Sequence, residues 1–163
     1  MVDHPKIVYE FWEKVKAECG IRGDFTDAWG FGDTPELKQE LLDLILEGKK
    51  RATTNLLMES EPAGYPPTGV GQFHVILDGD DVPTAVIRTV SMRKASFKDV
   101  DEDHAYWEGE GDRTVEFYLK EHVKFYTRVG KTLGFIFHED LEVEFERFEL
   151  VYPCEKSNAD GNQ

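Results

Sequence analysis

The most distinctive stretch of the sequence is a short cationic segment, Glu47-Gly48-Lys49-Lys50-Arg51-Ala52-Thr53-Thr54-Asn55. Three consecutive basic residues stand beside two threonines in a chain whose formal net charge is −14. A lysine held away from water loses part of its proton affinity and can act as a base, and a nearby hydroxyl can then become a nucleophile. A lysine of this segment and Thr53 or Thr54 are therefore candidate catalytic groups.

A second segment supplies acids, Glu108-Gly109-Glu110-Gly111-Asp112. Its glycines let the backbone turn tightly. A carboxylate beside Lys50 would fix the ammonium group and share protons with it. The spacing does not match a calcium loop, so we expect no metal site. The alternative interpretation is a solvated acidic loop.

Together these segments resemble the signature of the ASCH family, whose members have a PUA-like β-barrel. Gly48, Lys50 and Thr53 match its Gly-x-Lys-x-x-Thr pattern, the block Asp101–Arg113 looks like its acidic segment, and the match spans roughly residues 31–152. The resemblance implies Lys50 as base, Thr53 as nucleophile and Glu108 as the group that orients or protonates. Related members include an amidohydrolase that deacetylates a modified cytidine, and others are linked to RNA cleavage.

Several further side chains are candidate substrate contacts: Arg51, Asn55, Trp29, Tyr65, Glu110 and Arg88. Glu110 is also the alternative to Glu108, and Asn55 stands where the family commonly has an arginine. Trp29 could stack a base or simply pin its loop to the core. Tyr65 lies in a Pro/Gly-rich loop, Glu61–Gly69, and is a candidate lid residue.

Length and composition predict one folded domain. The chain has 163 residues, 40% of them hydrophobic, which is enough for a core without staples. We expect a single ASCH domain over residues 1–154, with a helical extension over residues 1–30 and a polar tail over residues 155–163. Cys19 and Cys154 are expected to be free thiols. With no export signal and no long apolar run, we expect a cytoplasmic protein without membrane contact.

The charge balance limits the kinds of partner that the protein is expected to bind. Asp and Glu number 33 against 19 Lys and Arg, so the overall field repels polyanions and bulk DNA binding is not expected. Contact with RNA would have to be local. A candidate patch, with scattered solvated charges as the alternative, consists of Lys49, Lys50, Arg51, Arg88, Arg93, Lys94 and Lys98.

Hydrophobic periodicity predicts the elements that position these groups. Apolar residues at intervals of three and four predict helices over residues 5–18, 35–47 and 114–129, and aromatic, Gly- and Asp-rich residues 20–34 indicate a loop. Strands are expected from Arg51 onward and, as a hairpin, over residues 73–77 and 85–90. A short amphipathic turn or helix should lie near Phe97–Trp107.

The closing strands are expected over residues 133–137 and 141–152. Leu141, Val143 and Phe145 alternate with acidic residues, and the phase slips at Arg147, as at a β-bulge. The alternation predicts an acidic outer face that includes Glu146. The fold class is therefore α+β, a mixed β-barrel with flanking helices.

Two functions fit these features. The first is a hydrolase that removes an acyl group from a modified nucleoside or acts on short single-stranded RNA. The second is a non-catalytic module that binds RNA or a nucleotide, and a metabolite sensor without turnover is a third. None of them requires a cofactor.

Overall fold

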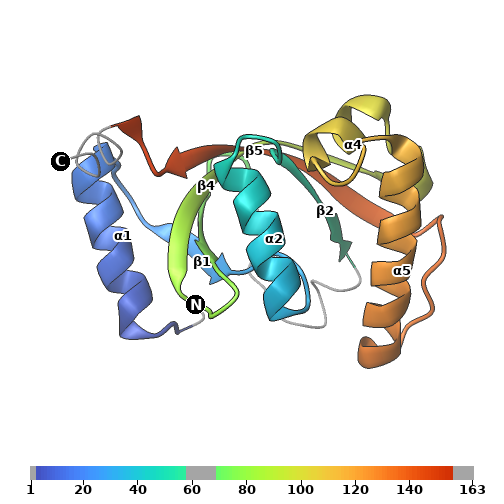
Figure 1. Ribbon diagram of the computed structural model, residues 1–163, viewed down its shortest axis with the longest axis horizontal. Coiled ribbons are helices and arrows are strands. Elements are labelled where there is room, and N and C mark those ends of the chain that lie inside the picture. The colour runs from blue at the N-terminus through green and yellow to red at the C-terminus, as the bar shows by residue number, and fades with distance from the viewer. Residues whose placement is uncertain (1–2, 58–68, 156–163) are drawn as a thin grey trace.

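The computed structural model describes residues 3–57 and 69–155. Within these residues the chain forms five strands, four α-helices and one short 3-10 helix (Figure 1). In chain order they are α1 (Lys6–Cys19), β1 (Phe25–Trp29), α2 (Pro35–Leu46), β2 (Ala52–Leu56), β3 (Phe73–Leu77), β4 (Pro83–Ser96), η1 (Phe97–Asp99), α4 (Glu102–Glu108), α5 (Val115–Leu133) and β5 (Glu142–Tyr152).

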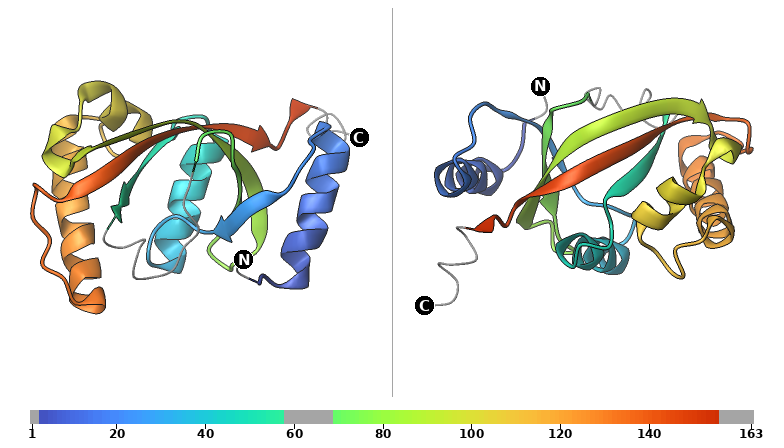
Figure 2. Two further views of the ribbon diagram at one scale, coloured as in Figure 1. Left: turned by 180° about the vertical axis from the view of Figure 1, so that it is seen from behind. Right: turned by 90° about the horizontal axis from the view of Figure 1, so that it is seen from above.

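All five strands belong to one mixed sheet in the order β1-β3-β4-β5-β2. The pairing of β1 with β3 is parallel and the other pairings are antiparallel. β4 and β5 are long and run across the whole molecule (Figure 2). The sheet is open, because the described residues show no pairing between its edge strands β1 and β2. The expected closed barrel is therefore wrong, while the α+β class is confirmed.

The helices cover different faces of this sheet. Alternate residues of β3 point to opposite sides: Val75 packs with α1, whereas Ile76 packs with α2. At the other end of the sheet, α4 and α5 pack on Phe145 of β5. The views from behind and from above show α1 and α5 at opposite ends of the molecule, with α2 between them (Figure 2).

Local sequence signals determine where α2 begins and ends, as predicted. The Thr34 hydroxyl accepts a hydrogen bond from Leu37 N, and Pro35 occupies the first turn, which is the expected N-terminal chemistry. Gly48 adopts a positive φ of 86° just beyond the helix, where its missing Cβ avoids strain. The chain then turns into β2.

Three element predictions are wrong. Residues 20–34 were expected to be a loop, but Phe25–Trp29 form β1, because parallel pairing with β3 supplies hydrogen bonds that local composition does not reveal. Gly130 was expected to end the long helix, yet α5 continues to Leu133 and ends at Gly134. Residues 133–137 are consequently not a strand.

The phase slip in the last strand has a cause other than the one expected. The bulge beside Arg147 lies in β4, where Val90 is the extra residue between the pairs Thr89–Phe148 and Ser91–Arg147. A second irregularity leaves Val151 of β5 extra between the pairs Ile87–Leu150 and Val86–Tyr152. In β5 itself, the apolar residues change face because α4 and α5 cover one side of the sheet and α2 covers the other.

The expected acidic outer face is also only partly present. Glu142 is exposed, but Glu146 is 2% exposed. Its side chain lies on the α2 side of the sheet, where it is buried together with Thr89. The sequence alternation identified an acidic face but not the part of it that other elements cover.

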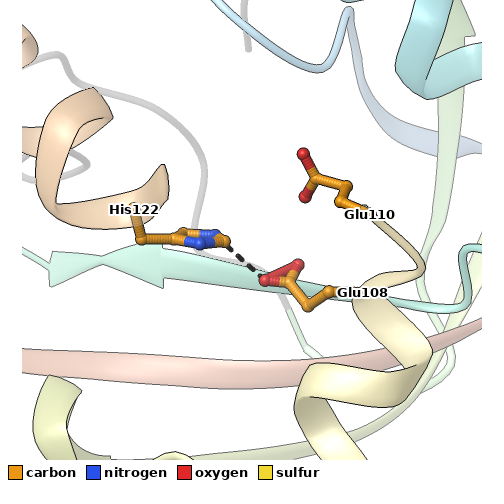
Figure 3. A group of neighbouring side chains, drawn as sticks. All are labelled: Glu108, Glu110 and His122. Carbon is orange, nitrogen blue, oxygen red and sulfur yellow. Dashed lines mark ion pairs between the residues drawn. The ribbon is translucent and has the colours of Figure 1, made fainter. Parts of the chain in front are cut away.

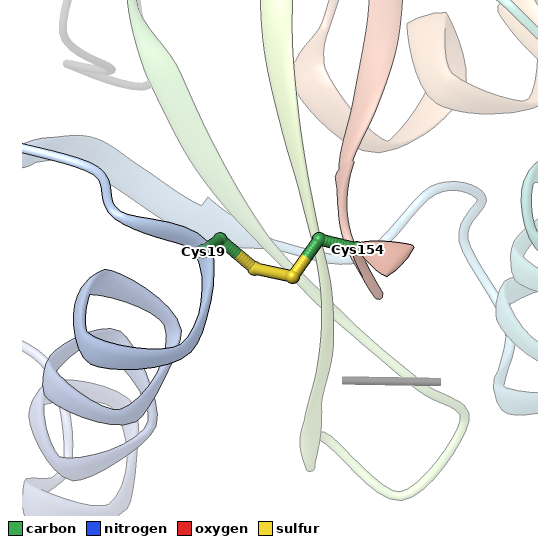
Figure 4. The surroundings of a disulfide bond; sticks show 2 residues. All are labelled: Cys19 and Cys154. Carbon is green, nitrogen blue, oxygen red and sulfur yellow. A yellow bond between two sulfur atoms is a disulfide. The ribbon is translucent and has the colours of Figure 1, made fainter. Parts of the chain in front are cut away.

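The two cysteines form a disulfide that joins the end of α1 to the segment after β5 (Figure 4). The prediction of free thiols is wrong, because folding places residues 135 positions apart with their Cα atoms 6.0 Å from each other. Among the described residues, no helix is long and apolar enough to cross a membrane.

Candidate active site

Lys50 lies at the turn between α2 and β2. Its backbone N–H and that of Lys49 both donate to the Leu44 carbonyl, so the turn folds back on the last turn of α2. Lys50 lies two residues before the first residue of β2 and is therefore not part of the strand. The Lys50 side chain is 2% exposed, which is rare for a lysine unless it is paired.

The end of α4 docks directly on this turn. Arg51 N donates to Trp107 O at 2.7 Å, and Arg113 Nη2 donates to Lys49 O at 3.1 Å. Gly109 has a φ of 78°, and a Cβ at this position would lie 2.4 Å from Lys49 O. Only glycine fits this close approach, and it brings the side chain of Glu108 to Lys50.

Lys50 and Glu108 form a buried ion pair. The distance from Lys50 Nζ to Glu108 Oε1 is 3.1 Å, and the Glu108 side chain is 3% exposed. Nζ also donates to Ala52 O at 2.8 Å and to Glu108 O at 3.4 Å. These three acceptors match the three hydrogens of an ammonium group.

Glu108 is also held by α5 (Figure 3). His122 Nε2 lies 3.0 Å from Glu108 Oε2, and His122 Nδ1 lies 2.9 Å from Tyr118 O. Because both ring nitrogens face acceptors, this geometry suits the imidazolium form. Burial alone would lower the pKa of His122, but the charge of Glu108 and the hydrogen bond to it raise this pKa above its ordinary value.

The two glutamates of the acidic segment differ in proton affinity. Burial alone would raise the pKa of Glu108, but Lys50 and His122 outweigh it and hold this pKa well below its usual range. Burial raises the pKa of Glu110 and the charge of Glu108 adds to this, although Lys50, 3.9 Å away, opposes both. Carboxyl groups whose pKa values diverge in one site suit separate acid and base roles.

A divalent metal fits this cluster poorly. Ligand atoms of Glu108, Glu110 and His122 lie within 4.8 Å of one another (Figure 3). However, the ammonium group of Lys50 contacts both carboxylates, so a metal would have to displace a buried cation that already balances their charge.

The two threonines of β2 have different surroundings. The Thr54 hydroxyl donates to Glu108 Oε2 at 3.2 Å and also contacts His104 Nε2 at 3.1 Å and the Tyr118 hydroxyl at 2.5 Å. One donor and two acceptor positions are thereby filled. The Thr53 hydroxyl makes no hydrogen bond within the described part of the chain, which leaves its oxygen available to a ligand.

A cavity of about 590 Å³ opens beside these groups, a size typical of small-molecule sites. Most of the predicted site residues line it: Lys50, Thr53, Glu108, Glu110, Asn55 and Trp29. Phe31 lines it as well, 4.4 Å from Trp29 between ring centroids and 5.4 Å from Lys50 Nζ to its ring. Trp29 thus both lines the cavity and packs against the core.

Two predicted contacts within the described residues, Arg51 and Arg88, are not part of this lining. Arg51 Nη1 donates to the carbonyls of Ile45 and Lys50, so it compensates the end of α2. Arg88 forms an ion pair with Glu149 on the surface. Tyr65 lies outside the described residues. Of the predicted basic patch, Lys50 and Lys94 line the cavity.

The cavity lining also contains buried polar groups that the sequence did not single out. His74 of β3 and Glu146 of β5 line the cavity and are 3% and 2% exposed. Burial lowers the pKa of His74 to about 4. Burial raises the pKa of Glu146, although hydrogen bonds from Thr89 and Asn55 oppose this.

Sequence reasoning also missed the partners of Glu108. His122, His104 and Tyr118 were not singled out as site residues. His104 and Glu108 are four residues apart and face the same side of a helix. That spacing was the available signal for His104, whereas His122 comes from α5 and meets Glu108 only through tertiary packing.

The fold and site define an α+β domain with an open mixed sheet and a buried lysine–glutamate pair at a cavity. The sequence profile of the ASCH domain matches residues 27–152, and the chain belongs to this family. The family resemblance of its two sequence blocks is thereby confirmed.

Solved structures support the same assignment. An ASCH domain from Lactobacillus crispatus JV V101 has a TM-score of 0.80 and 27% sequence identity, covering 91% of this chain and 96% of its own. A protein from Enterococcus faecalis V583 also has a TM-score of 0.80, with 26% identity over 97% of this chain and 95% of its own. No curated protein matches the sequence significantly.

Proposed function

We propose that this protein hydrolyses an amide on a modified nucleobase or nucleoside, with Thr53 as nucleophile, Lys50 as base, Glu108 as the group that orients Lys50 and Glu110 as the proton carrier. The observation that carries this proposal is the buried Lys50–Glu108 pair beside a cavity that the Thr53 hydroxyl also lines. Charged groups with perturbed pKa values in a cavity are characteristic of functional sites.

The chemistry requires a neutral lysine for one step. Lys50 passes a proton to Glu110, whose raised pKa favours the protonated form. Lys50 then takes the proton of Thr53 as the threonine oxygen attacks the acyl carbon, and the resulting ammonium stabilises the oxyanion. The C–N bond breaks as protonated Glu110 supplies the proton of the leaving amine.

The second half of the reaction restores the enzyme. Water attacks the threonine ester, the C–O bond to Thr53 breaks, and a carboxylic acid is released while the hydroxyl regains a proton. Glu108 remains ionised throughout and holds Lys50 in place. Glu108 is therefore the orienting group, and Glu110 is the proton carrier.

The charges around the cavity favour a small neutral substrate. Three cations line the rim, and each has an acidic partner: Lys94 with Glu144, Lys124 with Glu121 and Arg128 with Asp33. A net charge of −14 further disfavours a polyanion.

A non-catalytic nucleotide-binding module is the second candidate. The same rim cations, Lys94, Lys124 and Arg128, could exchange their acidic partners for phosphate groups. Binding of this kind weakens steeply as salt rises, whereas hydrolysis of a neutral nucleoside responds little to salt.

The test is incubation with acylated cytidines and with short single-stranded RNAs at low and high salt. Thr53→Val should lower kcat by about 10²- to 10⁴-fold, and Lys50→Ala should do so at least as strongly. Thr132→Val, an exposed position on α5, is the matched control. Unchanged turnover in both site variants would exclude the catalytic assignment. Salt-sensitive RNA binding without turnover would instead support the module.

A further inference from the structure

Three buried polar side chains, which together we call the floor of the cavity, take no part in the hydrolysis proposed above. His74 on β3, Thr89 on β4 and Glu146 on β5 lie on the same face of three adjacent strands. This is the face that α2 covers further along the sheet. The three side chains are 1% to 3% exposed.

Among the residues that the structure describes, His74 has a hydrogen-bond donor without an acceptor. Its Nδ1 accepts a hydrogen bond from Trp29 Nε1 at 3.0 Å, so the neutral ring carries its hydrogen on Nε2. Nε2 is buried and has no partner among the described residues. Buried donors of this kind are uncommon in folded proteins and call for a ligand or a water molecule.

Glu146, by contrast, has hydrogen-bond acceptor positions that are not filled by the described residues. Its carboxylate accepts hydrogen bonds from Thr89 Oγ1 at 2.8 Å and from Asn55 Nδ2 at 3.1 Å. Both donors are neutral, and no Lys, Arg or His in the described ranges forms an ion pair with it. A carboxylate has about four acceptor positions, so Glu146 can accept further hydrogen bonds from a ligand.

The floor is contiguous with the proposed catalytic groups. Thr53 stands directly opposite Glu146 in the β2–β5 pairing, an arrangement that brings two side chains side by side on one face. A wall of aromatic rings connects Lys50 with His74. Lys50 lies over Phe31, Phe31 contacts Trp29, and Trp29 contacts His74. A flat ring that lies along this wall would reach the floor while its substituent lies near Thr53.

We propose that His74 and Glu146 form a recognition subsite for the polar edge of a neutral planar heterocycle, such as a pyrimidine base. The His74 Nε2–H donates to a ring nitrogen or carbonyl oxygen of the ligand, and Glu146 accepts from an adjacent N–H group. The orientation, with the acyl group at Thr53 and the ring at the floor, rests on the proposed function.

Binding of free cytidine tests the subsite without requiring any reaction. Calorimetry compares the wild type with Glu146→Gln and His74→Phe, and 1-phenylribose serves as a probe whose ring lacks a polar edge. We expect Kd for cytidine to rise about 10-fold or more in Glu146→Gln and about 3- to 10-fold in His74→Phe. Kd for 1-phenylribose should stay within about twofold.

The matched control is Glu142→Gln, an exposed position on the same strand, which should leave both Kd values unchanged. Thermal melting shows whether each variant is folded. Should His74→Phe not fold, Glu146→Gln decides alone, because glutamine keeps the size and shape of the side chain.

The two proposals fail in different ways. Weakened cytidine binding in the variants supports the subsite even when no acylated nucleoside is hydrolysed. Hydrolysis with cytidine binding that is equal in all variants overturns the subsite and leaves the hydrolase standing. Absence of cytidine, uridine and adenosine binding to the wild type would also overturn the subsite, since a water molecule would then satisfy His74.

Discussion

Two buried carboxylates line the same cavity in different surroundings. Glu108 contacts the cations Lys50 and His122, and its pKa is lowered even though burial opposes this. In the described part of the chain, Glu146 accepts hydrogen bonds from the neutral donors of Thr89 and Asn55, and burial raises its pKa. The cations of the protein therefore balance the charge of Glu108, whereas Glu146 can still accept hydrogen bonds from a ligand.

We expect the largest loss of stability when the charge of Glu108, the ionic partner of Lys50 and His122, is removed. Glu108→Gln leaves Lys50 and His122 buried without their counter-charge and should lower the free energy of unfolding by about 3–5 kcal/mol. Glu146→Gln removes a buried charge that forms no ion pair within residues 3–57 and 69–155, and it should change stability by about 1 kcal/mol or less, in either direction. Urea unfolding measures both, and equal losses would refute the contrast.

The second effect concerns the contact that brings Glu108 to Lys50. Gly109→Ala combines a positive φ with a clash against Lys49 O and should cost about 2–4 kcal/mol. Gly134→Ala is the matched control, because Gly134 has a similar φ of 86° but nothing within 4 Å of the added Cβ. It should cost about 1 kcal/mol. Similar losses in the two variants would show that the close docking of α4 is unimportant.

The pH dependence of stability should have opposite signs at the two carboxylates. The lowered pKa of Glu108 contributes stability above its unfolded-state pKa of about 4.3, and this stability is lost as pH falls through the folded pKa. The raised pKa of Glu146 contributes stability below about pH 4.3, which is lost as pH rises through the folded pKa.

Unfolding by urea across a pH series checks these signs. The deficit of Glu108→Gln relative to the wild type should shrink as pH falls below about 4.3. The stability of Glu146→Gln relative to the wild type should improve as pH rises above about 4.3. Parallel pH curves for the wild type and both variants would contradict the assigned shifts.

The smallest effect is expected at the rim. Arg128 and Asp33 form a bidentate pair between α5 and the segment before α2, and 54% of the Arg128 side chain is exposed. Arg128→Ala should therefore change the free energy of unfolding by less than about 1 kcal/mol. Calorimetry should find the same Kd for a neutral nucleoside in this variant, whereas a marked loss would indicate phosphate-type recognition at the rim.

Local sequence signals were sufficient for much of the fold and for part of the site. Helix α2, with Thr34 at its start and Gly48 beyond its end, follows from capping chemistry. Lys50 and Glu108 were found through motif spacing, and the structure places them in contact. These features depend on residues close in sequence or on a pattern that the family shares.

The remaining features depend on long-range packing. β1 exists through its pairing with β3, and the Cys19–Cys154 bond joins segments that only the folded chain brings together. Glu146 looks like one more outward acid in an alternating strand, and His74 looks like one polar residue in an apolar strand. Their burial depends on which sheet face each helix covers, and periodicity within a single strand carries no such information.

The most direct test of the hydrolase assignment is to locate the acyl group during turnover. The protein is mixed with an isotopically labelled acyl cytidine, quenched within the first turnover and mapped by peptide mass spectrometry. The account predicts the label as an ester on Thr53 and its absence in Thr53→Val. A label on Thr54 or another residue, or turnover by Thr53→Val at the wild-type rate, would contradict it.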